Sequence, residues 1–532
     1  LSLHDALPIY AGKGEFGSQG PGAGDQGPER HKTPGALMVV GTASDVGKSA
    51  VTAGICRLLL RRGLKVGPFK SQNMALNAAV TPEGGEIGRA QAAQAAACRI
   101  TPHTDMNPVL LKPATDVGSQ VIVQGRSVGN MTVAEYDRFK PTAFESIRES
   151  FARLRNRFDF IVMEGAGSIA EINLKDRDIA NLAVARMAGD APAILVADID
   201  RGGVFAQVIG SIELLEDWER RLVKGIIINK FRGDISILRP GLDYIEKRCN
   251  IPVLGVLPYM KGLALPSEDS MNLPAPDSGE RPADRLCIGV IRLPRISNFT
   301  DFEPLQREPD VTLIYIERPE QTRGLDLLII PGTKSTAADL AWLRSQGLDR
   351  AIASRTGALL GICGGFQMLG ERIEDPEHVE SAVETVEGLA LLPAVTRLMP
   401  GKTTRQVMAS PAAGGLLVAP QWSGEIRGYE IHAGVTELEG GSLPFATLVS
   451  EDSGKSWNDG AVSGSGMVAG TYLHGLFDDS SFRNSILNRL RVKKGLSERE
   501  GAEIYPDPYD SLADSIGKHL DMELLWKICG IS

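Results

Sequence analysis

The nine residues 41–49 constrain the fold of this chain more than any other stretch. An apolar run, residues 36–40, precedes them and predicts a buried strand, and residues 50–62 carry apolar side chains at helical spacing. A strand, a glycine loop, Lys48-Ser49 and a helix follow one another in the order of a P-loop. Backbone N–H groups and the positive end of the helix can surround a polyphosphate there. The stretch therefore predicts a nucleotide site.

The residues of this loop have expected roles in that site. Lys48 would contact the β- and γ-phosphates of ATP, and the Ser49 hydroxyl would bind Mg²⁺. The other candidate nucleotide contacts are Gly41, Thr42, Ser44 and Gly47. Five residues rather than four separate Gly41 from Gly47, which departs from the usual spacing. The alternative is a glycine-rich strand-to-helix turn that holds no ligand.

Two further side chains come directly after apolar strands. Residues 159–163 end in Glu164, and a carboxylate at a strand tip before small residues suits a second Mg²⁺ contact; the alternative is a helix cap. Asn229 follows the strand 225–228, where its amide could contact an adenine edge or cap a helix. Because ligands bind outside the carboxyl ends of parallel strands, both positions fit a nucleotide site. Such apolar strands, alternating with helices, predict an α/β fold with a parallel sheet covered on both faces.

Composition divides the chain into segments. Residues 1–35 do not begin with Met and include a Gly-rich polar run; we expect them to be disordered or an artefact of the gene sequence. Residues 273–284 are Pro-rich and aperiodic, and predict a linker. The linker separates a P-loop half, 36–272, from a cysteine half, 285–480. Residues 481–532 predict a helical tail packed on the cysteine half.

The cysteine half carries a candidate nucleophile. The apolar strand 358–362 runs into Cys363, which has glycines on both sides and a helical start after it. This order is typical of a nucleophile elbow, and a following helix N-terminus favours the thiolate. The backbone N–H groups of Gly364 and Gly332 would form an oxyanion hole. The alternative is a buried structural cysteine.

A thiol nucleophile needs a base, and His474 is the best candidate among the seven histidines. It follows the apolar strand 470–473, so it would lie at a strand end, as Cys363 does. His432 is the rival, although a structural histidine is the ordinary interpretation of that residue.

Whole-chain properties exclude other classes of function. A chain of 532 residues is long enough for two or three domains, and its net charge of −9 gives no reason to expect nucleic acid or an anionic membrane as partner. No apolar run approaches the ~20 residues that cross a bilayer. Six scattered cysteines fit a reducing cytoplasm. The sequence makes no prediction of oligomeric state.

Both halves resemble known families. The P-loop is similar to that of dethiobiotin synthetase-like ATPases, and five strings of the P-loop half resemble the cobyric acid synthase family: 71–74, 86–88, 107–113, 164–168 and 198–205. The cysteine half resembles class I glutamine amidotransferase domains, in the variant found in that family and in cobyrinate a,c-diamide synthase. The matching segments are 331–336, 361–365, 428–434 and 470–477.

The resemblance implies a P-loop ATPase domain followed by a class I glutamine amidotransferase-like α/β domain. It also implies ATP, Mg²⁺ and L-glutamine, and amidation of four peripheral carboxylates of a corrinoid substrate, adenosylcobyrinic acid a,c-diamide. Class I domains carry a glutamate two residues after the histidine, where this chain has Leu476. The sequence therefore predicts only a Cys363–His474 dyad, with the orienting carboxylate absent or supplied from elsewhere.

Two alternatives remain at this point. Cobyrinate a,c-diamide synthase has the same architecture, but the strings 71–74 and 198–205 favour the first family. A P-loop switch ATPase with a non-catalytic amidotransferase-like module is more distant. Such ATPases carry an additional lysine near the start of the loop, which residues 41–47 lack.

Overall fold

The computed structural model describes residues 35–115, 118–260, 281–412, 422–440, 442–500 and 507–531. The predicted segment 1–35, apart from its last residue, and most of the predicted linker at 273–284 lie outside these residues.

The P-loop half is built on a six-stranded sheet whose neighbouring strands are all parallel. Its strands, in sheet order, are β12 (Val253–Pro258), β11 (Val223–Phe231), β10 (Ala193–Asp198), β1 (Gly35–Gly41), β9 (Phe160–Glu164) and β2 (Val66–Phe69). Successive side chains of β1 enter different cores, because residues alternate between the faces of a sheet. Leu37 and Val39 belong to one core, and Met38 and Val40 to the other. The prediction of a parallel sheet covered on both faces is confirmed.

Helices supply the other side of each core. The P-loop helix α1 (Lys48–Arg61) packs in the core of Leu37 and Val39. The opposite core takes side chains from α3 (Val133–Arg155), α4 (Leu182–Met187), α5 (Val204–Glu213), α6 (Asp217–Leu222) and α7 (Ile235–Cys249). The short helix α2 (Arg89–Ala97) lies beside α1.

The cysteine half is built on a second six-stranded sheet, in which only the pair β25–β26 is antiparallel. Its order is β14 (Val311–Ile316), β13 (Leu286–Ile291), β15 (Leu327–Ile330), β16 (Ala358–Ile362), β26 (Val468–Thr471) and β25 (Ala461–Val462). Its helices are α8 (Glu303–Gln306), α9 (Thr336–Ser345), α10 (Leu348–Ala353) and α11 (Gly364–Leu369). This half has the predicted α/β architecture.

Four smaller sheets complete the two halves. In the P-loop half, one sheet contains β3 (Gln72–Met74), β6 (Val109–Thr115), β7 (Gly118–Val123) and β8 (Arg126–Thr132). The other is the hairpin of β4 (Ala78–Val80) and β5 (Glu86–Gly88). In the cysteine half one sheet contains β20 (Thr403–Pro411), β21 (Ile426–His432), β23 (Ala446–Ser450), β24 (Ser456–Asp459) and β27 (Leu473–His474). The other contains β17 (Arg372–Glu374), β18 (Thr385–Glu387), β19 (Ala394–Arg397) and β22 (Val435–Leu438).

The hairpin β4–β5 joins the two halves, which belong to one compact unit. Its Val80 packs in a small apolar cluster with Tyr429 and Ile431 of β21. The Thr404 hydroxyl of β20 donates to the carbonyl of Gly84, at 2.6 Å. The hairpin therefore holds the P-loop half against the five-stranded sheet of the cysteine half.

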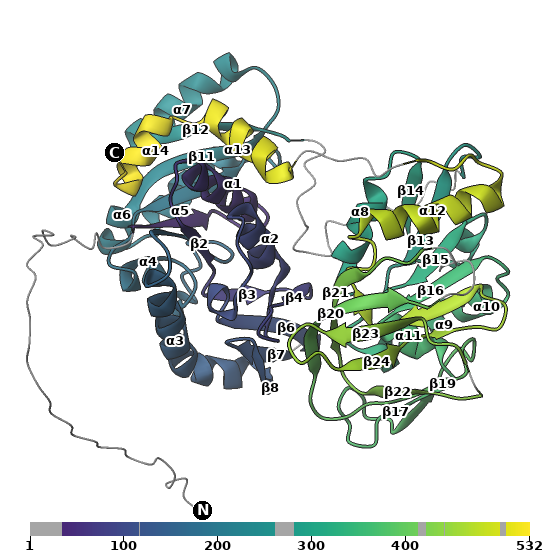
Figure 1. Cartoon of the computed structure of the whole chain (residues 1–532). Coiled ribbons are helices and arrows are strands. Elements are labelled where there is room, and N and C mark those ends of the chain that lie inside the picture. The colour runs from purple at the N-terminus through teal and green to yellow at the C-terminus, as the bar shows by residue number, and fades with distance from the viewer. Residues whose placement is uncertain are drawn as a thin grey trace, which may run out of the picture. The chain divides into compact units, whose positions relative to one another are not determined.

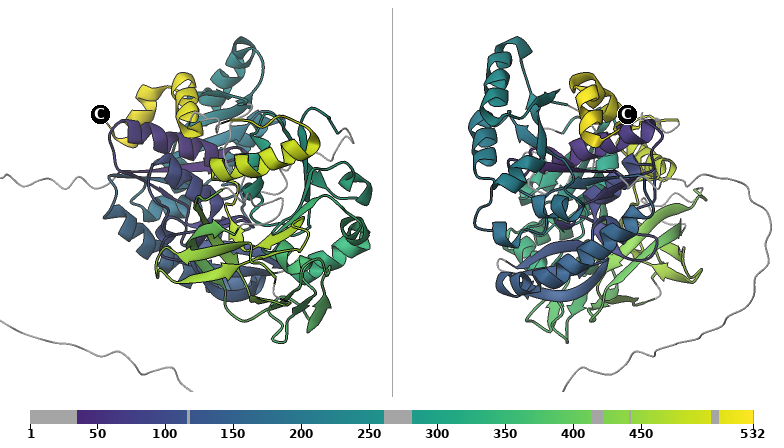
Figure 2. Two further views of the ribbon diagram at one scale, coloured as in Figure 1. Left: turned by 45° about the vertical axis from the view of Figure 1, so that its right-hand side comes forward. Right: turned by 90° about the vertical axis from the view of Figure 1, so that its left-hand side faces the viewer.

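The C-terminal tail divides between the halves. Helix α12 (Ser480–Lys494) packs on the cysteine half. Helices α13 (Pro508–His519) and α14 (Met522–Cys529) instead pack in the core of α1, and Figures 1 and 2 show them in yellow beside the purple P-loop helix. The prediction that the whole tail packs on the cysteine half is wrong for these two helices. Within this tail, Leu512, Ile516, Leu520 and Leu524 form a stripe at helical spacing, which indicates a buried face but carries no information about which core receives it.

Candidate active sites

The P-loop connects β1 to α1 and is shaped by Gly47. This residue adopts φ 98°, a left-handed conformation that favours glycine, and a Cβ there would collide with the Asn229 amide. The Lys48 ammonium donates to the carbonyl oxygens of Ala43, at 2.8 Å, and Gly167, at 2.9 Å. Lys48 thus lies across the loop, where it can reach a bound phosphate.

Glu164 is the centre of a buried polar group at the P-loop. The Ser49 hydroxyl and the Lys70 ammonium each donate to its Oε1, at 2.8 Å, and the Gln94 amide donates to its Oε2. Glu164 is 1% exposed. The structure therefore brings together Ser49 and Glu164, the two residues predicted to bind Mg²⁺. A hydroxyl and a carboxylate are oxygen ligands of the kind that Mg²⁺ prefers, so the residues fit this ion.

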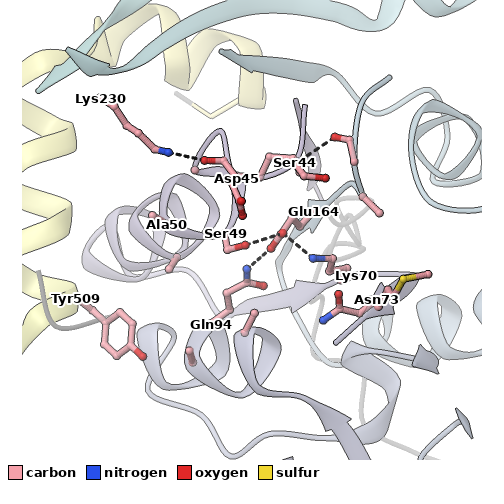
Figure 3. A pocket seen from close by; sticks show the side chains of 18 of the residues that line it. Ser44, Asp45, Ser49, Ala50, Lys70, Asn73, Gln94, Glu164, Lys230 and Tyr509 are labelled. Atoms are coloured by element: carbon pink, nitrogen blue, oxygen red, sulfur yellow. Dashed lines mark hydrogen bonds and ion pairs between the residues drawn. The ribbon is translucent and has the colours of Figure 1, made fainter. Parts of the chain in front are cut away.

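A cavity of about 660 Å³ surrounds this group. Figure 3 shows Ser44, Ser49 and Glu164 along it, with Lys70 and Gln94 pointing at the carboxylate. Sequence reasoning assigned no role at the site to Lys70, although its place at the end of β2 is a signal of the same kind that identified Glu164. Tyr509 of α13 also lines the cavity and was missed, because the tail was expected elsewhere.

The remaining predicted contacts lie at or behind the loop. The amide of Asn229 donates to the carbonyl of Val46, at 2.8 Å, so this residue supports the P-loop. An adenine contact by Asn229 stays a prediction. The Thr42 hydroxyl faces Gln207, at 3.4 Å. Gly41 ends β1, and a Cβ there would lie 3.0 Å from the Lys48 ammonium.

Cys363 lies at a strained turn between β16 and α11. Its φ of 53° and ψ of −112° are unfavourable for a residue with a side chain, so the surrounding backbone must impose them. The neighbouring glycines make this possible: a Cβ on Gly365 would collide with the carbonyl of Ile330, and one on Gly361 with Gly365. The predicted elbow geometry is present.

His474 is held by a carboxylate from a distant part of the chain. Its Nδ1 lies 2.6 Å from Asp301 Oδ2, and the N–H of Gly475 donates to Asp301 Oδ1, at 3.2 Å. Burial alone would lower the pKa of His474, but the Asp301 carboxylate and the contact with Cys363 raise that pKa to about 10. The other ring nitrogen has no hydrogen-bond partner in the described part of the chain.

The predicted dyad is therefore a Cys363–His474–Asp301 arrangement. The orienting carboxylate, which the sequence left absent or elsewhere, comes from the 3-10 helix at Phe299–Phe302, after β13. Its separation of 173 residues from His474 explains why spacing could not reveal it. A polar residue in a strand-end loop was the available signal.

The two predicted oxyanion glycines lie beside this arrangement. A Cβ on Gly332 would be 3.4 Å from His474 Cε1, and one on Gly364 would be 2.7 Å from Thr333 Cγ2. Both therefore lie near the nucleophile, and their role stays a prediction. His432, the rival base, stacks on Tyr472 with ring centroids 3.8 Å apart.

Two searches of the described residues give negative results. They contain no cluster of three or more histidine, cysteine or acidic side chains suited to hold a metal ion. They also contain no helix long and apolar enough to cross a membrane.

Comparisons with known proteins agree on both halves. Residues 37–273 match the family model of the CobQ/CobB/MinD/ParA nucleotide binding domain, and residues 287–482 match that of the CobB/CobQ-like glutamine amidotransferase domain. The chain is 50% identical to a cobyric acid synthase of Sorangium cellulosum (strain So ce56) over 519 residues, which cover 93% of this chain and 98% of the relative. A cobyric acid synthase of Moorella thermoacetica is 48% identical over 504 residues, covering 93% and 97% of the two chains. One of Salmonella typhimurium (strain LT2) is 47% identical, covering 93% and 98%.

Proposed function

The chain belongs to the cobyric acid synthase family, and from that premise we propose how its two sites share one reaction. It is a glutamine-hydrolysing carbon–nitrogen ligase of cobalamin biosynthesis. The observation that carries the proposal is the presence, in one compact unit, of a P-loop with a buried carboxylate and of a Cys–His–Asp arrangement. The first would activate a carboxylate, and the second would supply ammonia.

The P-loop half would make an acyl phosphate. A substrate carboxylate oxygen attacks the γ-phosphorus of ATP, the bond to the ADP oxygen breaks, and ammonia then replaces phosphate to give the amide. Lys48 would neutralise charge on the transferred group, and Lys70 and Gln94 keep Glu164 oriented. Mg²⁺, held by Ser49 and Glu164, would supply further charge neutralisation.

The cysteine half would hydrolyse glutamine. Cys363 attacks the side-chain carbonyl carbon, the carbon–nitrogen bond breaks, and ammonia leaves with a proton from His474. Water then releases glutamate from the thioester. Asp301 holds the imidazole through Nδ1, so that its other nitrogen serves the thiol and the leaving group. The N–H groups of Gly332 and Gly364 would stabilise the oxyanion.

The substrate we propose is adenosylcobyrinic acid a,c-diamide, which would be amidated at four peripheral carboxylates. A second cavity, of about 390 Å³, shares Ser44 and Gly167 with the nucleotide cavity and would receive one carboxylate arm at a time. Lys140 lines it, as does Met74, which is 57% exposed and offers the macrocycle an apolar contact. We place the reaction in the cytoplasm, because the six cysteines are free thiols.

The test measures ADP release and product mass with this corrinoid, for the wild type and Cys363→Ala, with glutamine or with ammonium as donor. We expect the variant to fail with glutamine and to add four amides with ammonium. A wild type that leaves this corrinoid unchanged but amidates cobyrinic acid twice would identify the alternative, cobyrinate a,c-diamide synthase. If neither corrinoid stimulates ATP hydrolysis, the proposed substrate is wrong. The switch ATPase alternative does not fit a chain of this family.

A further inference from the structure

The cavity at Cys363 is lined by both halves of the protein. It has a volume of about 240 Å³, and Cys363, Gly364 and Gln367 of the cysteine half line it. Five residues of the P-loop half line it as well: Leu76, Lys112, Gln120, Ser127 and Asn130. The cavity in which glutamine would be hydrolysed is therefore complete only when the two halves are docked.

The residues of the P-loop half that line this cavity are held in place by contacts between the two halves. Phe299, beside Asp301, donates its N–H to the Asn77 side chain, at 3.1 Å. Gln406 of β20 donates its amide to the carbonyl of Val80. Lys112, on the neighbouring sheet, pairs with Glu86 of β5, so its place in the cavity wall is tied to this hairpin.

Lys112 belongs to a buried group with more positive than negative charge. Its ammonium and that of Lys402 share one carboxylate, Glu86, with Lys402 at 2.7 Å. Lys334 lines the same cavity, so three lysines surround it. Burial and the repulsion from Lys402, only partly offset by Glu86, lower the pKa of Lys112 to about 7. Burial and the same repulsion lower the pKa of Lys334. A bound anion would relieve this repulsion.

The cavity also contains groups suited to a cation and to polar atoms. Glu380 lines it and accepts a hydrogen bond from the N–H of Thr336, at 2.9 Å. His432 lines it too; this residue is 9% exposed, its Nε2 lies 3.7 Å from the Glu430 carboxylate, and its Nδ1 has no hydrogen-bond partner among the described residues. Buried polar atoms of this kind need a partner, which a ligand can supply.

These charges match a free amino acid whose side chain reaches Cys363. An α-carboxylate would meet the lysines, an α-ammonium would meet Glu380, and the side-chain carboxamide would lie at the nucleophile. We propose that Lys112, a residue of the P-loop half, binds the α-carboxylate of glutamine and so completes the glutamine site of the cysteine half. This inference rests on the proposed glutamine hydrolysis and adds a substrate-binding residue to it.

The test compares Lys112→Met with the wild type, in the full chain. Methionine preserves the length of the apolar stem, and Glu86 keeps Lys402 as its partner, so the variant retains a paired carboxylate. The probe is 6-diazo-5-oxo-L-norleucine, a glutamine analogue that alkylates the nucleophile. Loss of a charged hydrogen bond predicts that the half-saturating concentration of this probe rises about tenfold or more. Alkylation of Cys363 by iodoacetamide, which has no α-carboxylate, should change by less than about twofold.

Two controls separate a binding role from a structural one. Lys224→Met, at an exposed lysine of β11, should leave both alkylation reactions unchanged, and Lys112→Arg should restore most of the probe affinity.

A second substrate gives an independent readout: 4-aminobutyramide lacks the α-carboxylate of glutamine. We expect the preference of the wild type for glutamine over this amide to fall about tenfold in Lys112→Met.

The outcomes are distinguishable. If the probe labels wild type and Lys112→Met with the same concentration dependence, or if both amides lose hydrolysis equally, Lys112 does not bind the carboxylate. If the probe fails to label even the wild type while iodoacetamide reacts at Cys363, the glutamine hydrolysis itself is wrong, and the role of Lys112 is wrong with it. Neither assay uses ATP or a corrinoid, so an error in the proposed corrinoid substrate affects neither result.

Discussion

At the scale of single residues, Cys363 lies at a strand end, whereas the carboxylate of Asp301 that orients His474 comes from a distant segment. Cys363 and Glu164 were identifiable because each follows an apolar strand, and strand ends converge in this type of sheet. Asp301 was not, because its partner His474 is 173 residues away and only folding brings them together. Lys112 was hidden for the same reason, since its cavity is formed from two halves.

The pairing of His474 with Asp301 predicts a particular pH dependence of stability. The folded-state pKa of His474 is raised to about 10, above the value near 6.5 of an unperturbed imidazole. The pair therefore contributes its full stabilisation below about pH 6.5 and loses it as pH rises through about 10. We expect Asp301→Asn to lower the free energy of unfolding by about 3 kcal/mol at the lower pH, because breaking a buried pair leaves an uncompensated group.

Urea unfolding of the wild type and of Asp301→Asn, at about pH 6 and at about pH 10, measures this difference in the free energy of unfolding. The difference in the free energy of unfolding between the wild type and Asp301→Asn should become smaller as pH increases. A gap that stays constant or widens would show that the pair does not titrate as described. Cys363→Ala is the control, since it removes the thiol contact and keeps the carboxylate.

At the scale of elements, the sequence predicted which segments are helices and strands better than where they pack. Strand β1 and the order of strand, glycine loop and helix at the P-loop follow from local sequence patterns, and the structure has both. The assignment of α13 and α14 to the cysteine half was wrong, because an apolar stripe fits any apolar core. Charges add to this packing on the P-loop half: Arg57 of α1 pairs with Asp507 and with Asp510 of α13, at 2.8 Å each.

These ion pairs predict unequal effects of two neighbouring arginines. Arg57 is 1% exposed at its side chain, whereas Arg61, which pairs with Asp510 and Asp514, is 37% exposed. Arg57→Met should destabilise the protein by about 3 kcal/mol, because it removes a buried guanidinium together with its pairs to Asp507 and Asp510 and its hydrogen bond to the Ala97 carbonyl. Arg61→Met should cost less than about 1 kcal/mol, as exposed pairs do. Urea unfolding followed by tryptophan fluorescence, to which Trp526 on α14 contributes, measures both. Equal effects of the two substitutions would contradict the proposed difference between buried and exposed pairs.

At the scale of the whole molecule, the composition of the sequence predicted two halves but not the contacts between them. The contacts of the β4–β5 hairpin with β20 and β21 use ordinary apolar and polar residues, which carry no sequence signature. The return of α13 and α14 to the P-loop half is likewise invisible in the order of the segments.

The structure predicts that cutting the chain between the halves does not separate them. A protease site placed within residues 273–284 should give two fragments that elute together from a sizing column under native conditions. They should separate in urea, because native packing of α13 and α14, which belong to the C-terminal fragment, against the N-terminal fragment is what holds the two together. The same site placed in a chain that ends after residue 500 is the control, and its fragments, which lack α13 and α14, should separate more readily. Fragments of the full chain that elute apart without denaturant would contradict the packing of the two helices.

The return of the last two helices also bears on how the protein is made. A ribosome releases a chain from its amino end, yet the face of α1 that receives Leu512 and Ile516 is not covered until α13 emerges. The P-loop half is synthesised first, but its core is complete only after the cysteine half has been made. Until α13 emerges, that apolar face is open to chaperones or to neighbouring nascent chains, and a message truncated before residue 508 would yield a P-loop half without this cover.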